Sequence, residues 1–451
     1  MKTLAGLARD LEAGATTSRR LVEDCLARIA DPNGEGPRTF LEVHAEPARA
    51  AAEYYDRLRE YGTTLTPWAG IPVSIKDLFD MAGDITTAGS TILRGQPPAR
   101  EDCPAVARMR AAGFIPLGRT NMTEFAYSGL GLNPHYGTPL SPFERERGRA
   151  PGGSSSGAAV SITEGMAYGA LGTDTGGSCR IPAAFCGIVG FKPTAHRVPV
   201  TGVFPLSRTL DSVGPLAASV HCCAALDAVL AGEPLATLQT VGLRGRRFAV
   251  PTHYVLHALD PHVARSFEGA LRALRRAGAE IAEIPLAELD ELPGINHDGG
   301  FAGAEAYALH RERLGSQKER FDRRVAMRIL IGREQSAADY LDLIRAREDM
   351  QRRVDRQLAD FEAVLLPTTQ IIAPLIEDLE TDEAYVRING QALRNTAITN
   401  FLDRCAISIP CQEAGTAPVG LMLMGHQDGD RALLALAAAV EALVSPAQLG
   451  T

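Results

Sequence analysis

The stretch GTDTGGSCRIP at residues 172–182 decides how this chain is interpreted, together with PGGSSSG at residues 151–157. Each stretch joins hydroxyl side chains to glycines. Glycine allows backbone N–H groups to turn toward one point and to approach it closely, which is how an oxyanion hole or an anion-binding nest is built. A serine in such a run, as Ser178 is, would be well placed to attack a carbonyl group.

The chain offers a lysine as the base for such a serine. A serine hydroxyl is a poor nucleophile until a neighbouring base takes its proton, and histidine is the usual base. None of the ten histidines lies in either stretch. A lysine can serve instead when burial keeps its amine neutral near pH 7. Lys76 meets this requirement, because it ends the segment Gly70–Lys76, which the pattern predicts to be a short buried strand.

Several further segments carry recognisable patterns, and the resemblance that they define is strongest from Gly70 to Thr194. They are GGSS at 152–155, GTDTGGSCRIPAAFCG at 172–187, GIPVSIKD at 70–77, TNMTEFA at 120–126, GFKPT at 190–194 and PVGL at 418–421. Taken together, over nearly the whole chain, these segments resemble the amidase-signature family.

The resemblance implies a catalytic triad of a serine, a second serine that follows a cis peptide bond, and a lysine. Ser154 precedes Ser178 by 24 residues, which is the spacing of the family's two serines. The resemblance therefore assigns Ser178 as the nucleophile, Ser154 as the proton relay and Lys76 as the base. It also implies that the peptide bond between Gly153 and Ser154 is cis.

The implied reaction is acyl transfer through an acyl-enzyme, with no metal and no other cofactor. Backbone N–H groups of Thr175, Gly176, Gly177 and Ser178 would hold the oxyanion. The implied fold is α/β, with a central mixed, mostly parallel β-sheet that helices cover on both faces. We expect a single domain over residues 1–451, with its signature core at about 70–216, because the sequence has no internal repeat and no low-complexity linker.

The periodicity of apolar residues predicts alternating helices and strands on either side of a region rich in glycine and proline at 118–214. Helices are expected at about 4–11, 18–29, 47–61, 103–112, 224–230 and 262–277, between 304 and 359, and after 424, and strands at 70–76, 114–117, 247–250, 280–284, 364–367, 406–410 and 419–424. The charged run Glu312–Arg328 is interpreted as the solvated face of a helix.

The composition excludes two classes of partner. The net charge is −8 and the basic residues are scattered, so we expect no nucleic acid partner. No stretch approaches the about 18 uninterrupted apolar residues that a membrane span needs, so we expect no membrane partner. The eight cysteines have no paired spacing, which predicts buried free thiols and a cytoplasmic protein.

Several motifs also have alternative interpretations. GSSSG at 153–157 fits the nucleophile elbow of an α/β-hydrolase, with Ser155 as the nucleophile, but that motif needs a preceding strand and residues 144–149 are charged. For Asp174 and Arg180 we favour a role in bracing the loop, and for Cys179 a role in packing.

The substrate is predicted from the segment 122–133, which the resemblance places near the nucleophile. Met122 and Phe125 would bind substrate as part of an apolar wall that also includes Tyr127 and Leu130. This wall favours small neutral amides or anilides, with carbamates (urethanes) as an alternative. A carboxylate clamp would need basic residues, and Arg180 and Arg404 are the evident candidates. Asp403 and Arg404 either face the pocket or form a surface ion pair.

Two competing functions stay open, both on the same fold. One is the amidase subunit of a tRNA-dependent amidotransferase, which hydrolyses glutamine for a partner subunit. The other is a catalytically inactive binding protein, against which the three triad residues argue. The oligomeric state is also open, with a homodimer as one alternative.

Overall fold

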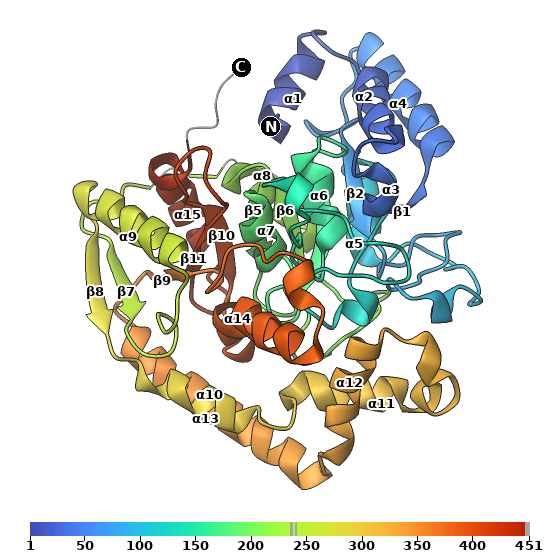
Figure 1. Ribbon diagram of the computed structural model, residues 1–451. Helices are drawn as coiled ribbons and strands as arrows, with labels where there is room; N and C mark the ends of the chain where they lie inside the picture. Colours follow the sequence, from blue (N-terminus) through green and yellow to red (C-terminus); the bar gives the residue numbers. More distant parts are fainter. Residues whose placement is uncertain (235–237, 240, 447–451) are drawn as a thin grey trace.

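One mixed β-sheet forms the centre of the protein (Figure 1). The structure is a computed structural model that describes residues 1–234, 238–239 and 241–446. In spatial order, the eleven strands found in these residues are β1 (Phe40–Val43), β3 (Ile115–Thr120), β2 (Pro72–Lys76), β4 (Ala170–Asp174), β6 (Ser212–Ala217), β5 (Val189–Lys192), β10 (Ala406–Pro410), β11 (Gly420–Met424), β9 (Ala363–Pro367), β7 (Arg247–Pro251) and β8 (Glu280–Ile284).

The sheet is mixed, as expected, but it is not mostly parallel. Of the ten neighbouring pairs in the described sheet, four are parallel, namely β3 with β2, β2 with β4, β9 with β7 and β7 with β8. The other six are antiparallel. Parallel neighbours need a crossover connection, whereas a short connection leaves strands antiparallel. The short connection 411–419 between β10 and β11 is of the second kind, so these two strands are antiparallel.

Helices cover both faces of the sheet, as expected. Alternate residues of β4 show this, because Ala170 packs in the cluster with α6 and Leu171 packs in the cluster with α8. Helices on the first face contact one another in the order α4 (Ala45–Glu60), α2 (Ser18–Ala30), α3 (Gly36–Thr39), α6 (Ser156–Thr163), α7 (Arg180–Cys186) and α14 (Asp382–Phe401). Those on the second face are α5 (Pro104–Ala111), α8 (Val220–Ala231), α15 (Asp430–Val444) and α9 (Pro261–Arg276).

The remaining helices complete the fold. They are α1 (Leu4–Glu12), α10 (Leu292–Ile295), α11 (Gly300–Gln317), α12 (Arg323–Ile331) and α13 (Ala337–Leu358). In Figure 1, α10 to α13 form the lower part of the view, and α14 lies between them and the sheet. None of the described helices has the length and apolarity that crossing a bilayer requires.

The helices and strands expected outside the glycine-rich region are present, with small shifts of their ends. The run Glu312–Arg328 is not one helix face, however. Helix α11 ends at Gln317, Phe321 is buried, and the Asp322 carboxylate accepts a hydrogen bond from the Arg324 N–H and so caps α12. After this break, α12 buries Val325, Ala326 and Ile329.

All eight cysteines are buried free thiols, as the sequence predicts. Cys179 has a packing role, with its side chain fully buried and its Sγ 3.6 Å from the carbonyl oxygen of Gly214. The single domain over residues 1–451 stays a prediction.

Candidate active site

Strand β2 delivers Lys76 to the face of the sheet that α6 covers. Side chains alternate along a strand, and Ser74, two residues earlier, contacts Ser161 of α6 with 2.9 Å between the two Oγ atoms. Val73 and Ile75 point to the opposite face, in the cluster with α5 and α8. The strand ends at Lys76, so the amine lies at the end of an interior strand, next to the serine-rich segment that leads into α6.

The Lys76 amine is fully buried among three hydroxyl groups. Its Nζ lies 2.8 Å from Ser154 Oγ, 2.9 Å from Ser155 Oγ and 2.8 Å from Thr173 Oγ1. Burial lowers the pKa of Lys76 from 10.5 to about 8, although nearby Cys179, Asp174 and Asp211 act to raise it. The amine is therefore close to the pKa at which a lysine can act as a base near neutral pH.

The hydroxyl groups of Ser154 and Ser155 differ in the acceptors that are available for their protons. Ser155 Oγ donates to the carbonyl oxygen of Thr173 at 3.3 Å, so toward Lys76 it acts as an acceptor. Within the described residues, Ser154 Oγ accepts a hydrogen bond from Lys76 Nζ and has no other hydrogen-bond partner. Its proton is thus free to point at the lone pair of a neutral amine. The peptide bond between Gly153 and Ser154 is cis, as the resemblance implies.

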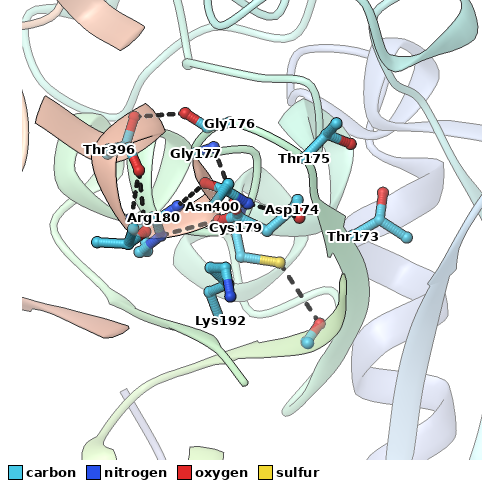
Figure 2. A network of polar contacts seen from close by, with 12 residues as sticks. Thr173, Asp174, Thr175, Gly176, Gly177, Cys179, Arg180, Lys192, Thr396 and Asn400 are labelled. Carbon is cyan, nitrogen blue, oxygen red and sulfur yellow. Dashed lines mark hydrogen bonds and ion pairs between the residues drawn. The ribbon is translucent and has the colours of Figure 1, made fainter. Parts of the chain in front are cut away.

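The Asp174 carboxylate holds the loop around Ser178 in place (Figure 2). It accepts hydrogen bonds from the N–H groups of Gly177 at 2.8 Å and Cys179 at 3.1 Å. It also pairs with the Arg180 guanidinium at 2.7 Å, with both side chains fully buried. Burial acts to raise the pKa of Asp174, but the attraction of Arg180 outweighs it and lowers the pKa to about 2. Asp174 and Arg180 therefore brace the loop, as we favoured from the sequence.

This brace changes the expected set of oxyanion donors. The N–H of Gly177 points to Asp174, so the expectation that it faces the reacting carbonyl is wrong for this structure. The N–H groups of Thr175, Gly176 and Ser178 have no acceptor among the described residues. Gly177 serves the loop through its backbone, because its φ is +138° and an added Cβ would lie 2.2 Å from Thr396 Oγ1.

A cavity of about 610 Å³ opens above this loop, and Thr175, Gly176 and Ser178 form part of its lining. The rest of the lining comes from the segment 126–128 and from α10, α11, α12 and α14, among other parts. Ser155 is fully buried and outside this lining, and no described strand runs directly into the serine-rich segment. The geometry therefore disfavours Ser155 as an elbow nucleophile.

Met122 and Phe125 do not line the cavity, so the predicted substrate contacts of these two residues are wrong. Phe125 has a left-handed backbone, with φ +50°. Its ring is turned into the core, where it stacks on Phe204 with the ring centroids 5.6 Å apart. Of the predicted wall, Tyr127 lines the cavity and Leu130 does not. Ala126 and Ser128, on either side of Tyr127, line it as well.

Arg180 and Arg404 cannot clamp a carboxylate in this cavity, since both are buried and bonded elsewhere. The Arg404 guanidinium pairs with Asp355 and donates to the Gly425 carbonyl oxygen at 3.1 Å. Asp403 also lies outside the lining and accepts from the Ala195 N–H at 3.0 Å. The arginines that do line the cavity are Arg328, Arg387 and Arg394, which the sequence did not single out.

Comparisons with known proteins identify the family of the chain. The family model named Amidase matches residues 20–434. The chain is 37% identical over 453 residues to a 2-amino-5-chloromuconic acid deaminase from Comamonas testosteroni, covering 98% of this chain and 96% of the relative. It is 32% identical to a glutamyl-tRNA(Gln) amidotransferase subunit from Acidobacterium capsulatum, covering 96% of this chain and 98% of the relative. A crystal structure of an amidase matches with a TM-score of 0.88 and 32% identity, over 98% of this chain and 100% of that chain.

The chain therefore belongs to the amidase family. It has the fold of the amidase-signature structures, and it is a hydrolase that acts on carbon–nitrogen amide bonds.

Proposed function

We propose that this amidase works through Ser178 as nucleophile, Ser154 as proton relay and Lys76 as base. One observation carries the proposal. The buried Lys76 amine contacts Ser154 Oγ at 2.8 Å, while Ser178 lines the adjoining cavity, where a substrate can reach it. The two serine segments touch, because the Ser155 N–H donates to the Ser178 carbonyl oxygen at 3.3 Å.

The reaction then runs as acyl transfer. Neutral Lys76 takes the proton of Ser154 as Ser154 takes that of Ser178, and Ser178 Oγ attacks the amide carbon. The N–H groups of Thr175, Gly176 and Ser178, which have no acceptor among the described residues, stabilise the oxyanion. The proton returns through Ser154 to the departing nitrogen, the C–N bond breaks, and an ester to Ser178 remains. Water hydrolyses this ester through the same relay and frees the acid and Ser178.

Steady-state release of ammonia from simple amides by the purified chain tests this proposal. Ser178→Ala and Lys76→Ala should each reduce the turnover number by about a thousandfold or more, since members of a catalytic unit do not act additively. Ser155→Ala serves as the comparison, and its turnover number should stay far above those of Ser178→Ala and Lys76→Ala. If Ser155→Ala lost as much activity as Ser178→Ala did, the result would support Ser155 as the nucleophile of an α/β-hydrolase elbow. If Ser178→Ala kept the wild-type rate, Ser178 would not be the nucleophile. If the wild-type protein itself released no ammonia above background, the inactive-protein alternative would gain support.

The substrate is proposed to be a small amide with a hydrocarbon portion. The cavity has the apolar wall that this portion needs, formed by residues such as Leu206, Leu292, Phe301 and Ile398. Anilides and carbamates stay candidates, since their planar carbonyl would occupy the same position. The neutrality expected from the sequence is not retained, because arginines also line this cavity.

The amidotransferase alternative stays open, since several relatives carry the name of such a subunit. A subunit of this kind would release ammonia from glutamine for a partner protein. Turnover of glutamine by the isolated chain far above that of other amides would favour it. Efficient turnover of other small amides without a partner or ATP favours a free-standing amidase.

We also propose a cytoplasmic location. The support is chemical, because all eight cysteines are free thiols buried in the core. Reduced thiols are the usual state in a reducing compartment.

A further inference from the structure

The cavity above Ser178 carries positive charge without a matching negative charge. Its lining includes Arg328 from α12 and both Arg387 and Arg394 from α14, but no aspartate or glutamate. Arg387 and Arg394 are seven residues apart on one helix, so they lie on the same face two turns apart. Arg328 belongs to a different helix. Three guanidinium groups are thus gathered from two elements around one cavity.

None of these three arginines forms an ion pair within the part of the chain that the structure describes. Arg328 lies over the ring of Tyr127, with its central carbon 4.6 Å from the ring centroid. Arg394 lies over the ring of Tyr254 at 4.3 Å, and its buried Nε has no hydrogen-bond partner. The aromatic faces hold the two guanidinium groups in place without neutralising them.

Neighbouring arginines of α12 are different. Arg323 pairs with Asp382 at 2.6 Å, and Arg324 contacts the same carboxylate at 3.6 Å. Neither of them lines the cavity. Lack of a carboxylate partner therefore distinguishes the cavity arginine of this helix from its two neighbours.

An arginine that lines a cavity and has no carboxylate side chain beside it is suited to bind a ligand that carries a carboxylate. A guanidinium binds a carboxylate through two parallel N–H···O bonds, which are short and roughly twice as strong as neutral ones. A neutral ligand would remove water from the arginines without forming such bonds, which costs binding free energy. The apolar residues that line the same cavity suit the hydrocarbon part of the same molecule.

We propose that this cavity selects small amides that also carry a carboxylate group, of the class of dicarboxylic acid monoamides, and that Arg328 and Arg394 are its principal carboxylate-binding residues. Arg387, which is exposed, adds attraction at the rim. Asn296 and Gln391 supply neutral polar contacts. The proposal rests on the proposed function for where the amide is cleaved, but carboxylate binding can be measured without any cleavage.

Binding is tested by titration calorimetry with succinate, glutarate and adipate, which contain no amide. The full-length protein and its Arg328→Gln, Arg394→Gln and Arg323→Gln variants are compared at low and high salt. Arg328→Gln and Arg394→Gln should each weaken the best-bound dicarboxylate by roughly tenfold to a hundredfold, as expected for a lost hydrogen bond between charged groups. The matched control Arg323→Gln, on the same helix, should bind as the wild type does. Equal binding by all four proteins, or no dicarboxylate binding at all, would overturn the proposal.

Kinetics then separate this proposal from the proposed function. Malonamate, succinamate and adipamate are compared with butyramide and hexanamide by ammonia release. The best acid amide should have a kcat/KM at least tenfold above both neutral amides, and Arg394→Gln should remove most of this preference by raising KM. Hydrolysis that depends on Ser178 but favours the neutral amides would overturn the carboxylate proposal alone. Dicarboxylate binding that depends on arginine, together with hydrolysis that survives Ser178→Ala, would overturn the proposed function alone.

Discussion

We predict that the hydroxyl of Thr173, which accepts a hydrogen bond from Lys76 at 2.8 Å, raises the pKa of that lysine. As an ammonium group, Lys76 donates three hydrogen bonds, to Ser154, Ser155 and Thr173. As a neutral amine it has two N–H bonds and a lone pair, so one of the three contacts must reverse or be lost. Removing the Thr173 hydroxyl with Thr173→Val therefore costs the charged form more than it costs the neutral form.

The magnitude follows from the buried position of the amine. A hydrogen bond to a charged group contributes about 1.5–3 kcal/mol, and one pKa unit corresponds to about 1.4 kcal/mol. The pKa of Lys76, which burial lowers to about 8, should fall by roughly one to two further units in Thr173→Val. The neutral fraction at pH 7 would then rise from about one tenth to about one half or more.

The assay is kcat/KM measured from pH 5.5 to 10 with one small amide. The wild-type value should rise with pH, by about tenfold between pH 7 and pH 9, because the neutral amine is the active form and its pKa is about 8. The Thr173→Val profile should reach its plateau one to two pH units earlier. Thr163→Val, at the end of α6 and without contact to Lys76, is the matched control. A wild-type profile that is flat across pH 8, or a Thr173→Val profile that coincides with it, would refute the reasoning.

Three further changes test the loop and the cavity. Arg180→Leu leaves the buried Asp174 carboxylate unpaired and should lower the free energy of unfolding by about 3–5 kcal/mol at pH 7 in urea denaturation. The pKa of Asp174 is lowered from 3.8 to about 2, so this stabilisation is present above pH 3.8 and should disappear as the pH falls toward 2. Gly177→Ala should reduce both kcat and stability, because its Cβ would collide with Thr396; wild-type kinetics would show that the loop adapts. Phe125→Ala should lower the free energy of unfolding by about 3–5 kcal/mol, as measured by calorimetry. A changed KM in this variant would indicate that Phe125 contacts the substrate.

Local motifs explain how much of the site could be predicted from sequence. The spacing of the two serines and the strand that ends in Lys76 are properties of short segments, and the structure brings Lys76 and Ser154 into contact. The brace between Asp174 and Arg180 could be foreseen for the same reason, since six residues separate the two. The broad order of helices and strands followed from apolar periodicity on both sides of the glycine-rich region.

The features that could not be predicted from the sequence depend on contacts between segments that are distant along the chain. Arg328 and Arg394 belong to two different helices that both line the cavity, and in the sequence both look like ordinary surface charges. Helix α14 was not expected, because it is buried on several sides and lacks one clear apolar stripe. The inward turn of Phe125 depends on a left-handed backbone that no residue pattern signals. The parallel share of the sheet was overestimated because it depends on strand order, not on the strands themselves.

Mass spectrometry of the protein treated with a serine-directed fluorophosphonate tests the central claim most directly. The reagent reacts with an activated serine hydroxyl, and peptide mapping locates the adduct. We predict one adduct, on Ser178, and a labelling rate at least about a hundredfold lower in Lys76→Ala, since general-base catalysis contributes about that much. An adduct on Ser155 with Ser178 unmodified, or undiminished labelling of Ser178 in Lys76→Ala, would contradict it.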